Sequence, residues 1–143
     1  MKKVILLFFL TSLLFAQRKE EINFDFDFSE FSYNDSINYV EFYYQVEKDN
    51  FNVVTQSGKN VISAILEISL SRISDNVVIV DKKYGITGIK DSLSNESELL
   101  GQFSIPVPVG EYNLRFTVFD KFNPKLSKTL NDELSVKPFP KDK

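Results

Sequence analysis

Two tyrosines and a glutamate alternate in a pattern typical of a surface that binds other molecules. Tyr39, Glu41 and Tyr43 are two residues apart within residues 37–47, and side chains at that spacing lie on one face of a β-strand. An exposed tyrosine offers an apolar ring and a hydroxyl to a protein or a sugar. The three residues are therefore a candidate binding surface. Cross-strand aromatic pairs that stabilise the sheet, or a face covered by another chain or domain, explain the same pattern and are the favoured interpretation.

Two aspartates repeat this spacing in the preceding segment. Asp25 and Asp27 lie on one face of a predicted strand, where their carboxylates could contribute oxygen ligands to a calcium site. Alternating charges also discourage an edge strand from pairing with another chain, and this second interpretation is favoured. We therefore predict no metal and no other cofactor.

The chain lacks the side chains on which most enzymes depend. It contains no histidine and no cysteine, which supply the usual general base, the common nucleophile–base pairs and most zinc ligands. Paired carboxylates could still hydrolyse a glycosidic bond, but none of the 20 acidic residues lies in a recognisable context. The five glycines form no phosphate-binding loop. We therefore expect no enzymatic activity.

Alternation of apolar and polar residues predicts the elements that position these side chains. The pattern favours seven strands, at residues 23–33, 37–47, 60–72, 77–84, 99–107, 111–120 and 126–136. A change of phase near Ser29 and Glu30 predicts a bulge that keeps Phe31 and Tyr33 on the apolar side. Residues 85–96 are expected to form a long connection with at most one short strand. This spacing predicts an all-β, immunoglobulin-like antiparallel sandwich.

A short motif before the sixth predicted strand indicates how the two sheets are joined. Pro108 precedes Gly110 by two residues, and Gly110 precedes Tyr112 by two residues. Immunoglobulin-like sandwiches use a tyrosine at such a corner to hydrogen-bond upstream backbone. Gly110 and Tyr112 are therefore predicted to form a structural corner with no direct functional role.

The N-terminus has the layout of a cleavable secretory signal. Lys2 and Lys3 precede an apolar run that ends at Ala16, after which charged residues follow at once. The run is too short for a membrane anchor. We predict a signal peptide at 1–16, a short segment at 17–22, a sandwich domain at 23–137 and a tail at 138–143.

Composition restricts the compartment and the partners. Without cysteine the chain has neither disulfides nor the lipid anchor of a bacterial lipoprotein, so stability must come from packing, to which 14 Phe and 6 Tyr contribute. Cleavage removes two lysines and changes the net charge from −3 to −5, which argues against nucleic acid and anionic lipid as partners. We expect a periplasmic or extracellular bacterial protein with no stable membrane anchor.

Two stretches resemble the N-terminal β-module of bacterial exported proteins that are named for a C-terminal GWxTD motif. They are FSYNDSINYVEFYYQV at residues 31–46 and LLGQFSIPVPVGEYNLRFTVFD at residues 99–120. The chain contains no tryptophan, so the GWxTD motif itself is absent, and the resemblance implies no catalytic residue. Pro138 and Pro140 resemble the start of a linker, which suggests a stand-alone module or a shortened gene.

Three functions remain open at this point. The favoured one is a non-catalytic sandwich that binds another envelope protein through a sheet face or edge. The alternative is a glycan-binding module that uses Tyr39 and Tyr43. The third, a small hydrolase, would require two facing carboxylates in a pocket.

Overall fold

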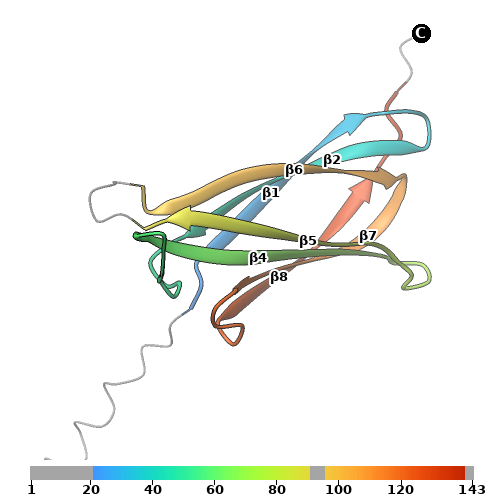
Figure 1. Ribbon diagram of the computed structural model, residues 1–143. Coiled ribbons are helices and arrows are strands. Elements are labelled where there is room, and N and C mark those ends of the chain that lie inside the picture. The colour runs from blue at the N-terminus through green and yellow to red at the C-terminus, as the bar shows by residue number, and fades with distance from the viewer. Residues whose placement is uncertain (1–20, 91–95, 141–143) are drawn as a thin grey trace, which may run out of the picture.

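The computed structural model describes residues 21–90 and 96–140 as an all-β chain (Figure 1). Within these residues there is no helix, and so none that could cross a membrane. The predicted signal peptide lies outside the described residues. The strands are β1 (Phe24–Ser32), β2 (Ile37–Glu47), β3 (Val54–Gln56), β4 (Lys59–Arg72), β5 (Val78–Ile89), β6 (Glu98–Pro108), β7 (Gly110–Asp120) and β8 (Ser127–Val136).

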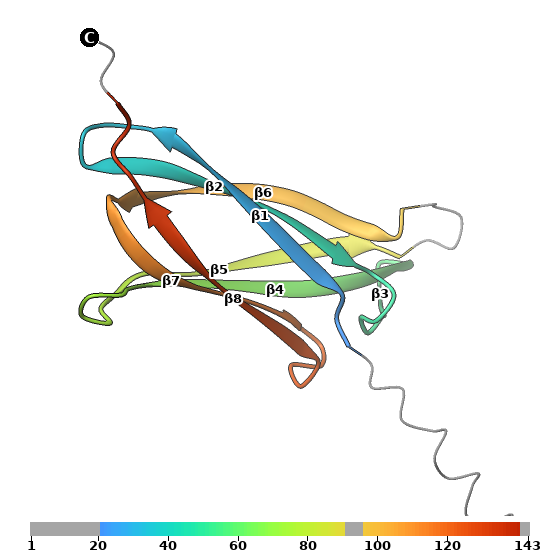
Figure 2. The same cartoon turned by 180° about the vertical axis from the view of Figure 1, so that it is seen from behind.

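The strands form two antiparallel sheets that face each other. One sheet has the order β1-β2-β6, and in the other β4 pairs with β3, β5 and β7, while β7 also pairs with β8. Figure 1 and Figure 2 show the two layers from opposite sides. The chain passes from one layer to the other between β6 and β7. The all-β antiparallel sandwich predicted from the alternation is confirmed.

The core lies between the inner faces of the two sheets. Val40, Phe42 and Val46 of β2 point inward and are buried, as their alternation predicts. Phe116 of β7 contacts aromatic rings from the opposite sheet, with centroids 5.0 Å from Phe24, 5.3 Å from Phe26, 5.9 Å from Phe103 and 6.4 Å from Phe42. Such edge-to-face aromatic packing adds to the stabilisation from buried apolar area, so these phenylalanines hold the layers together without disulfides.

Two strand predictions are wrong in an informative way. β5 continues to Ile89, because Tyr84, Ile86 and Gly88 keep the alternation and their side of the strand is partly buried. The glycines and polar residues in this segment hid that period. In addition, the short β3 was not predicted. It forms a hairpin with β4 through Ser57 and Gly58, whose φ angles of 49° and 75° suit a two-residue turn.

The bulge predicted near Ser29 and Glu30 is also wrong. β1 pairs with β2 in one unbroken register from Phe24 opposite Val46 to Ser32 opposite Asn38. Strict alternation therefore places Phe31 on the outer face, with 49% of its surface exposed, and Tyr33 beyond the strand is 59% exposed. The edge of the sheet tolerates an outward aromatic ring, so no bulge is needed to turn it inward.

The corner between β6 and β7 contains the hydrogen bond that the motif predicts. The Tyr112 hydroxyl donates to the carbonyl oxygen of Pro108 at 2.8 Å, and the side chain is 1% exposed. The tyrosine ring lies so close to Gly110 that a Cβ there would approach its hydroxyl oxygen to 3.0 Å. Burial raises the pKa of the Tyr112 hydroxyl, while nearby Arg72 lowers it. Tyr112 and Gly110 thus fix the passage between the sheets.

Candidate functional site

The outer face of the β1-β2-β6 sheet carries all three residues of the predicted binding surface. Tyr39 and Tyr43 are 38% and 37% exposed, and Glu41 lies half-buried between them. Residues directly opposite one another in the sheet point to the same side, so side chains from the three strands form rows across this face. The rows are Phe31–Tyr39–Pro106, Ser29–Glu41–Ser104, Asp27–Tyr43–Gln102 and Asp25–Gln45–Leu100.

Aromatic side chains gather at the end of this face where β1 turns into β2. The rings of Tyr33 and Tyr39 meet edge to face with centroids 4.8 Å apart, and Phe31 lies directly opposite Tyr39. Asn34 shapes the turn, because its Oδ1 accepts hydrogen bonds from the backbone N–H groups of Ser36 and Ile37, each at 2.9 Å. We call the surface formed by Phe31, Tyr33, Tyr39 and Tyr43 the aromatic face. Its first two members were missed because a bulge was predicted.

Polar groups surround Tyr43 in the middle of the sheet. Partial desolvation raises the pKa of its hydroxyl, and Glu41 raises it further through a hydrogen bond and its charge. A hydrogen bond with Ser29 lowers the same pKa, whereas the Asp27 charge raises it. The phenol therefore stays neutral at ordinary pH and can act as a hydrogen-bond donor or acceptor. An apolar ring beside two carboxylates suits a ligand with both apolar and cationic or hydroxyl groups.

A shallow groove of about 490 Å³ lies beside Tyr43 at the other end of the same sheet. Side chains from β1, β2 and β6 line it: Asp25, Phe26, Asp27, Tyr43, Tyr44, Gln45, Leu100, Gly101 and Gln102. Gly101 makes room for the Tyr44 ring, which packs over the glycine and would collide with a Cβ there. The groove could hold one or two sugar rings or a short peptide segment.

The residues considered for metal binding do not form a cluster. Asp25 and Asp27 are exposed on the outer face of β1, and Asp27 Oδ1 accepts a hydrogen bond from the Phe28 N–H at 2.8 Å. No group of three acidic residues within residues 21–90 and 96–140 is arranged to hold an ion. Asp27 thus satisfies a backbone N–H group at the edge of the sheet.

Asp120 is the one buried acidic residue within residues 21–90 and 96–140. The sequence pattern predicts no role for it. Its Oδ2 accepts hydrogen bonds from the backbone N–H and the side-chain amide of Asn52, at 2.6 and 2.8 Å. Its Oδ1 accepts from the backbone N–H groups of Phe122 and Asn123, at 2.7 and 3.2 Å. Because both oxygens are already engaged, Asp120 fastens two loops together. It is not positioned to transfer a proton.

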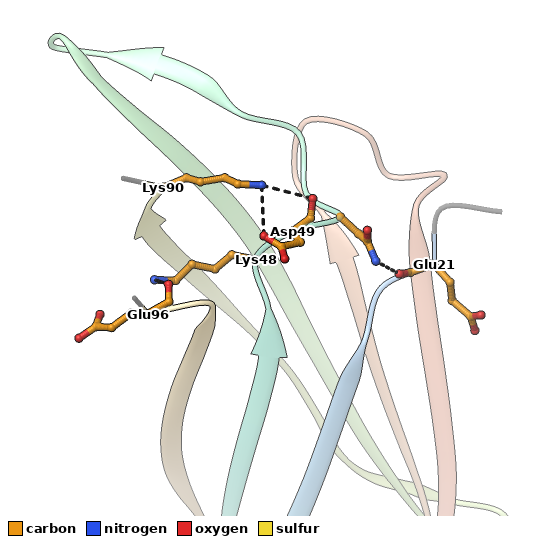
Figure 3. A network of polar contacts seen from close by, with 6 residues as sticks. Glu21, Lys48, Asp49, Lys90 and Glu96 are labelled. Carbon is orange, nitrogen blue, oxygen red and sulfur yellow. Dashed lines mark hydrogen bonds and ion pairs between the residues drawn. The ribbon is translucent and has the colours of Figure 1, made fainter. Parts of the chain in front are cut away.

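Polar contacts also hold together the end of the sandwich where the chain enters β1 (Figure 3). Lys48 is 5% exposed, and its ammonium group donates to the Glu96 carbonyl oxygen at 3.0 Å. Lys90 reaches the carbonyl oxygen of Asp49 at 3.3 Å and its carboxylate at 3.7 Å, while Asn50 donates to the carbonyl oxygen of Glu21. These bonds link loops, and Asp49 and Lys90 also line a hollow of about 900 Å³ beside the β3–β4 turn.

Comparison with known proteins adds no relative. No protein-family model matches the chain, and no curated protein matches it. Function must therefore be argued from the surfaces of this molecule alone.

Proposed function

We propose that this chain is a non-catalytic, exported β-sandwich of the bacterial cell envelope that binds another protein through the aromatic face. The observation that carries the proposal is the group of exposed rings of Phe31, Tyr33 and Tyr39, which are 49%, 59% and 38% exposed. Tyr43, 37% exposed, lies on the same face beyond Glu41. Isolated exposed apolar residues are normal, whereas a contiguous group marks an interaction site.

Composition supports this choice of partner. Tyrosine and phenylalanine are enriched at protein–protein interfaces, and polar residues form their rim. Here the rim is acidic, since Asp25, Asp27 and Glu41 share the outer face with the rings. We expect a partner surface that offers apolar pockets bordered by lysine or arginine.

Strand order supports an immunoglobulin-like topology as part of the proposal. The tyrosine corner lies where the chain leaves one sheet and begins the penultimate strand of the other, which is its position in immunoglobulin-like domains. The first stretch that resembles the GWxTD-associated module covers β2, and the second covers β6, which pairs with β2 along its whole length, and β7 of the other sheet.

A tagged copy of the protein tests the proposal in cross-linked envelope extracts of the bacterium that encodes it. We expect one specific partner with the unaltered chain and loss of that partner with the double variant Tyr39→Ala, Tyr43→Ala. The matched control is Asn113→Ala, Arg115→Ala, which truncates two exposed side chains on the outer face of the other sheet. Equal recovery by both variants, or no specific partner in repeated preparations, would exclude the aromatic face.

Glycan binding is the second candidate, and the groove beside Tyr43 favours it. Sugars stack on tyrosine rings and hydrogen-bond to carboxylates, and both groups border the groove. On a polysaccharide array, the unaltered protein should bind a defined glycan and the Tyr39→Ala, Tyr43→Ala variant should not, although it keeps its fold. An array without any binding would remove this candidate and leave the protein-binding proposal intact.

A further inference from the structure

The four long edge strands of the sandwich differ in how their backbones are protected. In an antiparallel pair, alternate residues direct their N–H and C=O groups to the partner strand or away from it. An unpaired row of such groups can accept another strand, so natural proteins block most of their edges. The edges here are β1 and β6 in one sheet and β5 and β8 in the other.

Aspartate side chains protect β1 and β8. Glu47 N–H donates to the Asn23 carbonyl oxygen, so the backbone N–H and C=O groups of the odd-numbered residues of β1 point to β2. Those of the even-numbered residues point away from the sheet. Asp27 caps one of them, the N–H of Phe28, at 2.8 Å. On β8, Asp132 accepts a hydrogen bond from the N–H of Glu133 at 2.8 Å. Asp120 N–H donates to the Leu126 carbonyl oxygen, so the even-numbered backbone groups of β8 point to β7 and the N–H of Glu133 points away from it.

Prolines protect one end of β6. Val109 N–H bonds the Ser36 carbonyl oxygen and Lys48 N–H bonds the Ser97 carbonyl oxygen, so the odd-numbered residues of β6 face β2. Pro106 and Pro108 therefore fall on the unpaired side, where each removes a donor that an incoming strand would need. Three of the four edges thus carry a proline or a capped N–H on part of their unpaired side.

The edge of β5 carries no such block. Lys90 N–H bonds the Asn60 carbonyl oxygen, so the even-numbered residues face β4 and the N–H groups of Lys83, Gly85 and Thr87 face outward. Within the described chain, β5 contains no proline, and no side chain accepts a hydrogen bond from these three N–H groups. Gly85 also leaves room for a second backbone to approach.

Apolar side chains lie half-buried beside this edge, between β5 of one sheet and β6 of the other. The rings of Tyr84 and Phe103 stack with centroids 4.4 Å apart across the two sheets, and Ile86 and Leu99 are also only partly buried. A strand added to β5 would place every second side chain over these apolar groups. Apolar residues at those positions would complete the burial of the two rings.

Charge selects the incoming strand. Lys82 is exposed on the face of β5 that carries Tyr84. Lys83 is exposed on the opposite face, where its ammonium group lies 2.5 Å from the Glu67 carboxylate and Asp81 is also exposed. Lys82 therefore favours an incoming strand with an acidic side chain opposite it. The even-numbered residues of a second β5 would share that face and include no acid, so a segment of another protein is the better match.

We propose that the free edge of β5, from Lys82 to Ile89, accepts an extended segment of another protein as an added strand, with apolar residues toward Tyr84 and Phe103 and an acidic residue on the same face toward Lys82. Main-chain hydrogen bonds supply affinity in this mode of recognition, and alternate side chains supply specificity. The proposal goes beyond the aromatic face, because β5 belongs to the other sheet.

A library of 12-residue peptides displayed on phage provides the probe. Selection against the whole protein should enrich sequences with apolar residues at every second position and an acidic residue at one end of that alternation. With a synthetic copy of an enriched peptide, amide exchange followed by NMR should slow at Lys83, Gly85 and Thr87, the N–H groups that face outward. Enriched peptides without this alternation, or unchanged exchange at these three amides, would overturn the proposal.

Backbone variants separate the β5 edge from other surfaces. Gly85→Pro removes one outward N–H and should weaken peptide binding by about tenfold or more, whereas Gly85→Ala keeps the N–H and should bind normally. Asn131→Pro makes the matched change on the unpaired side of β8 and should have no effect. Should Gly85→Pro fail to fold, Lys82→Glu gives an independent readout, with binding of the acidic peptide expected to fall by about tenfold.

Two further outcomes would overturn the proposal rather than the proposed function. Loss of peptide binding in Tyr39→Ala, Tyr43→Ala, with Gly85→Pro unaffected, would assign the peptide to the aromatic face. A dimer in sedimentation experiments that disappears in Gly85→Pro would show that a second copy occupies the edge. Conversely, binding of the peptide at β5 leaves the aromatic face to be judged by its own experiment.

Discussion

Tyr112 and Tyr43 are the same residue type in two regions of one sandwich, and their surroundings give them opposite roles. Tyr112 is 1% exposed, and its hydroxyl is bound to the Pro108 carbonyl oxygen. Tyr43 is 37% exposed on an outer face beside a groove. The corner uses the ring for burial and the hydroxyl for backbone geometry, whereas the aromatic face leaves both available. Changes at the corner should therefore affect stability, and changes on the face should affect binding.

The largest expected effect is that of Tyr112→Ala. Removing a fully buried aromatic ring typically lowers the free energy of unfolding by about 3–5 kcal/mol. Urea unfolding followed by circular dichroism would measure it. A loss below about 1 kcal/mol would mean that the corner contributes little, and the contrast with the aromatic face would fail.

A smaller effect is expected from Tyr112→Phe, which keeps the ring and removes the hydroxyl. The Pro108 carbonyl oxygen then loses its partner, and the free energy of unfolding should fall by about 1 kcal/mol. Tyr43→Phe is the control for the same atomic change on the exposed face. Similar losses in the two variants would show that the corner hydrogen bond has no special weight.

Alkaline pH should act on the corner as well. Burial raises the folded-state pKa of Tyr112 above the ordinary value of 10.0, so the folded state favours the protonated phenol. The resulting stabilisation is complete below pH 10 and is lost as the pH rises from 10 through the folded-state pKa. Unfolding experiments across this range should show a steeper decline for the unaltered chain than for Tyr112→Phe. Identical slopes would contradict the assignment.

The smallest effect on stability is expected on the aromatic face. Tyr39→Phe and Tyr43→Phe change exposed hydroxyls and should alter the free energy of unfolding by no more than about 0.5 kcal/mol. Thermal unfolding would measure the change. A loss well above this value would favour the interpretation in which these tyrosines stabilise the sheet through cross-strand contacts.

Much of the fold could be predicted because burial follows a period of two. The alternation through Val40, Phe42 and Val46 predicted which face of β2 lies in the core, and the same reasoning placed Tyr39 and Tyr43 outside. The reasoning failed where local signals conflicted with the period. Gly85 and Gly88 interrupt the apolar pattern in the second half of β5. The aromatic ring of Phe31 indicates burial by its type, yet the unbroken register places it on the outer face. An edge strand tolerates both features, since one of its sides meets solvent.

The predicted surface of Tyr39, Glu41 and Tyr43 is accordingly only part of the candidate site. Tyr33 joins it through a turn, and Gly101 from β6 contributes to the groove beside it. Tyr33 lies outside β2, and Gly101 is remote from Tyr43 along the chain. The pattern of one segment does not reveal contacts between strands.

The sequence by itself determined the all-β class, the outward direction of Tyr39 and Tyr43 and the corner at Tyr112, because each follows from spacing within a few residues. Only the tertiary structure decided which strands lie at the edges. Whether an N–H group faces a neighbour or solvent depends on pairing between distant segments, and so the caps at Phe28 and Glu133 and the open edge of β5 became visible only in the assembled sheets.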